Sequence, residues 1–100
     1  MNESKPNLSV CMIVKDEERD LVRCLSSVTP VARQIVVVDT GSIDRTVEIA
    51  RSFGAEVFGY EWRDDFSAAR NFSLEKARCD WILVIDADEE LTSSTIAKLP

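Results

Sequence analysis

The sequence predicts an α/β domain built on an open, mostly parallel sheet that is flanked by helices. Residues 8–14, 34–38 and 81–85 are nearly continuous apolar runs of strand length, which is typical of strands buried on both faces. Segments with helical spacing separate these runs, and strands that alternate with helices favour a parallel sheet with right-handed crossovers. With 100 residues, 45% of them hydrophobic, the chain is long enough for one small domain with a modest core.

The first half of the chain is expected to form a strand, a helix and a second strand. Residues 1–7 are expected to be a flexible lead-in, and residues 8–14 (LSVCMIV) the first strand. The acids after that strand favour a helix start because they complement the helix dipole, and Pro30 ends the helix. Residues 34–38 (QIVVV) form the second strand, which is rich in β-branched side chains. The inner face of the helix is expected to carry Leu21, Cys24, Leu25 and Val28.

A second helix and a third strand are expected next. Asp44 or Ser42 is the expected N-cap of this helix, and Gly54 is suited to end it. Residues 55–58 (AEVF) then form a short strand. The inner stripe of the helix is expected to consist of Val47, Ala50 and Phe53.

A third helix and a fourth strand complete the predicted order β-α-β-α-β-α-β. Asp64 or Asp65 is expected to cap the helix, which runs to about Arg78. Residues 81–85 (WILVI) form the fourth strand, and the acidic sequence DADEE follows it directly.

The composition narrows the classes of function. A net charge of −6 argues against general nucleic-acid binding and favours a cation or a cation-bridged phosphate as a partner. The chain has no histidine and its three cysteines are widely spaced, so we expect reduced cysteines in the core rather than a zinc site. No apolar run approaches the ~20 residues that span a bilayer, and the first residues lack the order of a signal peptide. A cytoplasmic protein is expected, and peripheral membrane association stays open.

Polar clusters follow three of the predicted strands, at residues 15–17, 39–42 and 86–88. In open parallel sheets, ligands bind in the crevice at the carboxyl ends of the strands. We therefore expect these three clusters, which are distant in sequence, to meet at one edge of the sheet.

Asp86 and Asp88 are candidate metal ligands. If the strand conformation persists past Ile85, alternate residues point to the same side, and both carboxylates face one point. A hard cation with oxygen ligands, Mg²⁺ or Mn²⁺, would offset their repulsion, and substrate phosphates would complete its coordination. The alternative is an acidic turn that is solvated and purely structural.

Asp39 and Arg70 are candidate ligand contacts. The Asp39 carboxylate can accept hydrogen bonds from a nucleobase or ribose, and Gly41 allows a close backbone approach. The alternative is a turn that only caps the following helix. Arg70 can stack on a base or donate to it. Its alternative is a structural ion pair with Asp64, Asp65 or an acid at a strand end.

Four segments resemble the family 2 glycosyltransferases, whose domain has the GT-A fold with a Rossmann-like nucleotide-binding half. In order along the chain, the segments are CMIVKDEERDLVRCLSS, QIVVVDTGSIDRTVEIARSFGAEVF, WRDDFSAARNFSLEKA and DWILVIDADEEL. The resemblance implies metal-assisted transfer of a sugar from a nucleoside-diphosphate donor, a UDP-sugar first among them, to an unknown acceptor with inversion at the anomeric carbon.

The resemblance also assigns roles to residues. Asp39 would contact the nucleobase with Arg70 near it, and Val14 and Glu17 would line the nucleotide pocket. By the same similarity, Asp86 would approach the ribose or the water shell of a Mg²⁺ or Mn²⁺ ion, and Asp88 would ligate that ion.

The sequence departs from the family pattern in two residues and in length. Asp16 stands where Asn is frequent, and Ile43 where Thr is frequent. A family domain is about twice as long, so residues 1–100 are expected to be a truncated N-terminal, donor-binding part with little turnover. The general base is expected beyond residue 100, and the missing part would cover an edge of the sheet.

Two other functions stay open. Haloacid-dehalogenase-like phosphotransferases also place Asp-x-Asp after a buried strand, with Asp86 then the nucleophile and Asp88 the acid/base. Glu90 stands where that family usually has Thr or Val, and the motif follows the fourth strand rather than the first. The other alternative is a nucleotide-binding module without catalysis.

Overall fold

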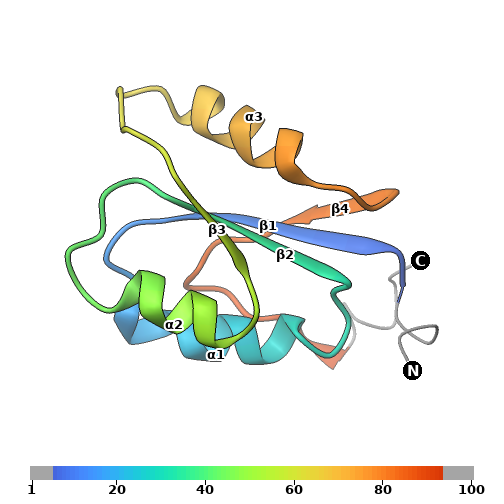
Figure 1. The fold of residues 1–100 in the computed structure, drawn as a ribbon. Coiled ribbons are helices and arrows are strands. Elements are labelled where there is room, and N and C mark those ends of the chain that lie inside the picture. The colour runs from blue at the N-terminus through green and yellow to red at the C-terminus, as the bar shows by residue number, and fades with distance from the viewer. Residues whose placement is uncertain (1–5, 94–100) are drawn as a thin grey trace.

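The computed structural model describes residues 6–93, in which strands and helices alternate along the chain (Figure 1). The elements are β1 (Leu8–Val14), α1 (Glu18–Val28), β2 (Gln34–Asp39), α2 (Thr46–Ser52), β3 (Glu56–Gly59), α3 (Phe66–Lys76) and β4 (Trp81–Val84). The four strands form one sheet in the order β3-β2-β1-β4, and each neighbouring pair is parallel. The predicted α/β class and the order of elements are confirmed. The predicted lead-in, residues 1–7, falls mainly on residues 1–5, which lie outside the described part.

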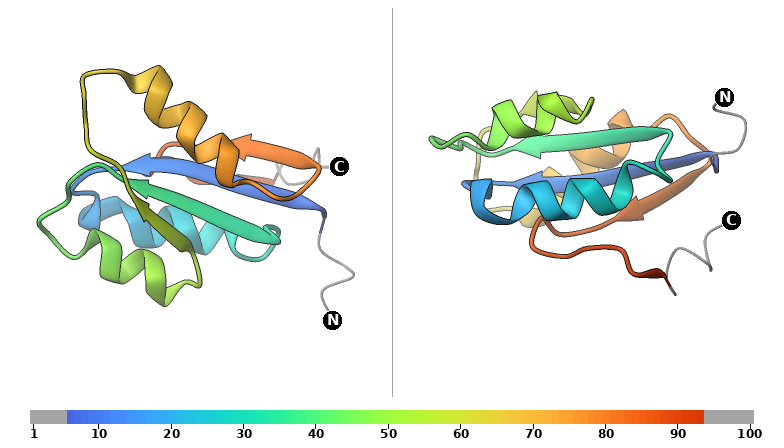
Figure 2. Two further views of the ribbon diagram at one scale, coloured as in Figure 1. Left: turned by 45° about the horizontal axis from the view of Figure 1, so that its top comes forward. Right: turned by 90° about the horizontal axis from the view of Figure 1, so that it is seen from below.

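The helices cover both faces of the sheet. α1 and α2 lie against one face and α3 lies against the other (Figures 1 and 2). The chain moves outward from β1 to β3 and then returns to the far side of β1 to form β4. Right-handed crossovers in opposite directions place their helices on opposite faces, which explains the position of α3. The direction reverses between β1 and β4, and a crevice at such a switch point is where open α/β sheets bind ligands.

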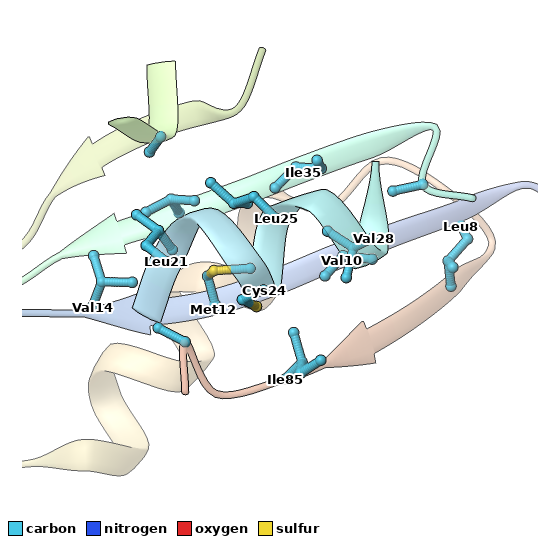
Figure 3. Packing of buried hydrophobic residues seen from close by; sticks show 14 residues of the cluster. Leu8, Val10, Met12, Val14, Leu21, Cys24, Leu25, Val28, Ile35 and Ile85 are labelled. Atoms are coloured by element: carbon cyan, nitrogen blue, oxygen red, sulfur yellow. The ribbon is translucent and has the colours of Figure 1, made fainter. Parts of the chain in front are cut away.

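Both faces of β1 and β2 are buried, as predicted. The larger core lies between the sheet and α1, and Figure 3 shows Val10, Met12, Leu21 and Leu25 packed together there. The smaller core lies beneath α3 and contains Cys11 with alternate residues of β2. Alternation of side chains along a strand thus sends neighbouring apolar residues to two separate cores.

β4 differs from the strand that the sequence predicts. It ends at Val84 instead of Ile85, and Trp81, Ile82 and Val84 are exposed by 56%, 44% and 38%. β4 pairs only with β1, so it is an edge strand of the described sheet. An apolar run alone does not tell how many neighbours a strand has, and the expected double-sided burial is wrong for this element.

The helix boundaries also differ in part from the prediction. α3 begins after Asp65, whose side chain accepts a hydrogen bond from the Ala68 N–H as expected, but it ends at Lys76. Buried Gln34 explains this end, because its amide donates to the Lys76 carbonyl and accepts from the Arg78 N–H. Neither of the residues expected to cap α2 is its N-cap, which is Arg45. Within residues 6–93, no helix has the length and apolar character needed to cross a membrane.

Candidate functional site at the carboxyl edge of the sheet

The loops that follow β1, β2 and β3 lie at the same edge of the sheet, at the left of Figure 1. A cavity of about 260 Å³ opens there between β1 and the start of α3. Its lining residues are Ile13, Val14, Lys15, Glu17, Thr40, Trp62 and Phe66. Val14 and Glu17, which the sequence analysis assigned to a nucleotide pocket, therefore both border this cavity.

The loops after β1 and β2 are joined by a pair of hydrogen bonds that we call the Asp16 clasp. The Asp16 N–H donates to Ser42 Oγ at 2.8 Å, and the Ile43 N–H donates to Asp16 Oδ1 at 2.8 Å. Asp16 has φ +52°, a left-handed conformation that Asn and Asp tolerate better than most residues. An Asn could accept the same bond through its side-chain carbonyl, so Asp16 fills the place of the family Asn without loss of the contact.

The Asp39 carboxylate is held by the turn that follows it. It accepts hydrogen bonds from the backbone N–H groups of Gly41 at 3.3 Å and Ser42 at 3.2 Å, and from the Ser42 hydroxyl. Gly41 has φ +118°, which a residue with a side chain rarely adopts. Because Ser42 also accepts from Asp16, the clasp fixes the hydroxyl that orients Asp39.

A second set of contacts positions Glu17. Its N–H donates to Thr46 Oγ1 at 2.8 Å, and the Glu18 N–H donates to Asp44 Oδ2 at 3.2 Å. Asp44 also accepts from the Thr46 N–H at 2.9 Å, and the hydrogen bond from the Thr46 hydroxyl is the main cause that lowers the pKa of Asp44. Asp44 thus satisfies free N–H groups at the starts of both α1 and α2, although it is not the N-cap residue itself.

Arg70 lies beside the cavity without an ion pair to any residue in the described part of the chain. Its guanidinium carbon lies 5.0 Å from the centre of the Phe66 ring, and Phe66 lines the cavity. The Arg70 Nε atom is buried and has no hydrogen-bond partner. The structural ion pair that the sequence left open is absent, and Arg70 keeps hydrogen-bond donors for another partner.

The Asp86–Asp88 segment leaves the strand conformation earlier than predicted. The Ile85 N–H still donates to the Cys11 carbonyl at 3.1 Å, but Ala87 and Asp88 form a turn. That turn is closed by the side chain of Glu89, which accepts from the Asp86 N–H at 2.8 Å. The condition under which both carboxylates would face one point, a strand that persists past Ile85, is therefore not met. Burial still alternates, since Ile85 and Ala87 are in the core and both aspartates are exposed.

Three side chains of helix α1 form hydrogen bonds with the backbone of residues 86–91. The Cys24 thiol donates to the Asp86 carbonyl at 3.6 Å, Arg23 donates to the Asp88 carbonyl at 3.4 Å, and Ser27 accepts from the Leu91 N–H at 2.9 Å. Sequence reasoning missed Cys24, Ser27 and Glu89. The i, i+3 spacing of Cys24 and Ser27 places them on one face of a helix, but nothing in the sequence links that face to residues 86–91.

The acids at this edge interact electrostatically. Burial is the main cause that raises the pKa of Glu17, and the charges of Asp88, Asp20, Asp44 and Asp86 raise it further. Carboxylates that follow β1 and β4 therefore lie close enough to interact. Carboxylate oxygens suit a hard divalent cation. Among residues 6–93, no group of three or more cysteine or acidic side chains is arranged to hold a metal ion.

Comparison with known proteins identifies the family. The sequence profile of glycosyl transferase family 2 matches residues 9–99. A TPR repeat-containing protein of Synechococcus elongatus is 55% identical over 84 residues, which are 84% of this chain and 21% of that protein. An uncharacterized glycosyltransferase of Rickettsia bellii is 40% identical over 85% of this chain and 29% of its own length.

A solved structure shows the same fold. Glucosyl-3-phosphoglycerate synthase from Mycobacterium tuberculosis, crystallised with Mn²⁺, UDP and glucosyl-3-phosphoglycerate, superposes with a TM-score of 0.71 at 22% identity. The match covers 89% of this chain and 37% of the synthase, and it confirms the predicted Rossmann-like half of a GT-A fold. The chain thus spans less than two fifths of each of these proteins. Because the profile matches residues 9–99 of the 100 residues, the chain belongs to glycosyl transferase family 2.

Proposed function

We propose that residues 1–100 are the N-terminal, donor-binding part of an inverting glycosyltransferase that uses a UDP-sugar and Mg²⁺ or Mn²⁺. The observation that carries this proposal is the position of Glu17 in the lining of the cavity at the end of β1, at the same edge of the parallel sheet as the acidic turn after the neighbouring strand β4. It brings a residue of the cavity next to β1 together with the acidic turn after β4, on either side of the switch point of the sheet. A nucleotide in the cavity would thereby have its diphosphate near two carboxylates that need a cation.

Each predicted residue has a role in this proposal. Val14 and Glu17 line the nucleotide pocket, and Asp39 accepts hydrogen bonds from the base through the carboxylate that Ser42 orients. Arg70 has no ion pair within residues 6–93, and its guanidinium would donate toward the nucleotide. The M. tuberculosis synthase, whose structure holds UDP and Mn²⁺, supports this choice of donor and ion.

The acidic turn would hold the cation. Asp88 would ligate it, and Asp86 would contact either its water shell or the ribose. When bound, the ion would act as a Lewis acid that neutralises the negative charge gathering on the leaving diphosphate. Ile85 and Ala87 are buried on either side of Asp86, so the backbone that carries the two carboxylates would be anchored before the donor arrives.

NMR titration of the ¹⁵N-labelled protein tests the proposal without requiring turnover. With Mg²⁺ and UDP, we expect amide shifts at three segments, residues 14–17, 39–42 and 86–89, and also around Arg70. Substoichiometric Mn²⁺ should broaden the amides around Asp86–Glu89 and Glu17 first. An absence of shifts at all three segments, at millimolar Mg²⁺–UDP and with a dispersed spectrum, would contradict the proposal.

Matched variants separate ion binding from nucleotide binding. Asp88→Asn should abolish the Mn²⁺ broadening and weaken UDP binding, while saturating UDP still shifts residues 39–42. Glu75→Gln removes an exposed carboxylate near the other end of α3 and should change neither response. Equal Mn²⁺ broadening in wild type and Asp88→Asn would show that Asp88 does not ligate the ion.

A further inference from the structure

Trp62 is a cavity-lining residue without an assigned role. It lies in the loop between β3 and α3, lines the cavity beside Phe66 and is 42% exposed. Its indole N–H donates to Asp64 Oδ1 at 3.0 Å, and Asp64 has φ +58°. The polar atom of the indole is therefore already satisfied, and the apolar ring faces remain available for a ligand.

The two aromatic residues of the cavity differ in what they contact. The ring of Phe66 carries the Arg70 guanidinium, whereas Trp62 stacks on no ring or cation within residues 6–93. On the sheet side, the cavity is bounded by Ile13 and Val14 of β1. A flat, apolar ligand group can thus lie between the end of a strand and a large aromatic side chain.

The position of the acids decides which end of a donor enters this cavity. Asp39 borders the cavity through its neighbour Thr40, which lines it. Neither Asp86 nor Asp88 lines the cavity or adjoins a residue that does, so a diphosphate and cation held by them lie outside. The base is at the opposite end of a nucleoside diphosphate from the β-phosphate. We propose that Trp62 stacks on the base of the bound nucleotide and is a binding residue of the donor site. This inference rests on the proposed function, and it adds a contact from the β3–α3 loop to that function.

Removal of a stacked aromatic should weaken nucleotide binding measurably. Base–aromatic stacking is worth about 1–3 kcal/mol, which corresponds to roughly 5- to 150-fold in Kd. Every base has a π-face, so the effect should be similar for UMP and CMP. It should be absent for pyrophosphate with Mg²⁺, which has no base.

The two tryptophans provide a direct test by fluorescence. Trp81 pairs with Leu8 at the opposite edge of the sheet, so it serves as the matched control. In Trp81→Phe only Trp62 emits, and its fluorescence should be quenched by UMP. The emission of Trp62→Phe should not respond. In Trp62→Ala the Kd for UMP, measured by calorimetry, should rise 5-fold or more, with Trp62→Phe between it and wild type.

The outcomes separate this inference from the proposed function. If wild type binds UMP, but Trp62→Ala binds it equally well and Trp81→Phe shows no quenching, the stacking proposal is overturned and the donor site stands. If Trp62→Ala weakens only UDP-sugar binding and leaves UMP unchanged, Trp62 contacts the sugar, which also overturns it. If wild type binds neither UMP nor Mg²⁺–UDP, both proposals fail. A dispersed NMR spectrum of each variant confirms that it is folded.

Discussion

Substitutions at Asp16, whose side chain is an acceptor in the Asp16 clasp, should change the free energy of unfolding and the affinity for UDP to different extents. Asp16→Ala removes the acceptor of the Ile43 N–H, and a hydrogen bond of this kind contributes about 0.5–1.5 kcal/mol. It also places Ala at φ +52°, where a residue with a β-carbon and no local polar contact costs about 1 kcal/mol more. The two effects add, so Asp16→Ala should lower the free energy of unfolding by about 2 kcal/mol.

Two further substitutions at Asp16 isolate the two effects. Asp16→Gly loses the same hydrogen bond but relieves the left-handed strain, so its stability should lie within about 0.5 kcal/mol of wild type. Asp16→Asn keeps an acceptor oxygen and tolerates the conformation, so it should match wild type. Urea unfolding measures the series, and a loss of about 2 kcal/mol corresponds to roughly 10 °C in Tm for a chain of this size.

UDP binding should follow a different order. Ser42 orients Asp39, and the Asp16 side chain holds the next residue, Ile43. Because Asp16→Ala and Asp16→Gly both lose this hold on the turn, both should weaken UDP binding several-fold. Asp16→Asn should bind like wild type. The stable but weakly binding Gly variant is the decisive one. If it binds UDP as tightly as wild type, the clasp does not position Asp39; if Asp16→Ala is as stable as Asp16→Asn, the energies assigned to the clasp are wrong.

Two other predictions concern a charge and a buried amide. Glu17→Gln should raise the free energy of unfolding at pH 7, because burial and neighbouring acids raise the pKa of Glu17 in the folded state. The gain should be constant above the raised pKa, shrink as the pH falls through it and vanish below the ordinary value of 4.5, as urea unfolding at low salt can show. Gln34→Leu should lower the free energy of unfolding by about 3–5 kcal/mol, because it leaves the Ser9 hydroxyl, the Lys76 carbonyl and the Arg78 N–H without their shared partner. Arg78→Lys, which alters only an exposed ion pair to Glu56, should cost far less, and equal losses would refute the role given to Gln34.

The sequence predicts those parts of the fold that depend on local pattern. The apolar runs of β1 and β2 predict central strands, because a strand that is covered on both faces needs apolar residues at nearly every position. β4 has the same pattern and is nevertheless exposed, because its place at the sheet edge depends on which strands pair beside it. The end of α3 was also misplaced, since Gln34, more than 40 residues away in the chain, captures its last carbonyl.

The same distinction applies to the candidate site. The placement of Asp39, Asp86 and Asp88 at one edge can be predicted because Asp39 ends β2, the other two follow β4, and parallel strands end at a common edge. The residues that hold the backbone of these aspartates cannot be predicted from the sequence. Cys24 and Glu89 act through hydrogen bonds to the backbone of Asp86, and such contacts leave no periodic or compositional signal.

Helix α1 connects the two halves of the proposed donor site. It begins directly after Glu17, which lines the cavity, and its later turns hold the Asp86 carbonyl through Cys24. The inner face of the same helix, including Leu21 and Leu25, is fully buried against β1 and β2 (Figure 3). A close-packed interface resists sliding, because any shift opens voids or creates overlaps. The separation between the nucleotide end and the cation end of the site is therefore set by the packing of the hydrophobic core. On this view the long apolar stripe of α1 contributes to ligand geometry as well as to stability, although none of its side chains would touch the donor.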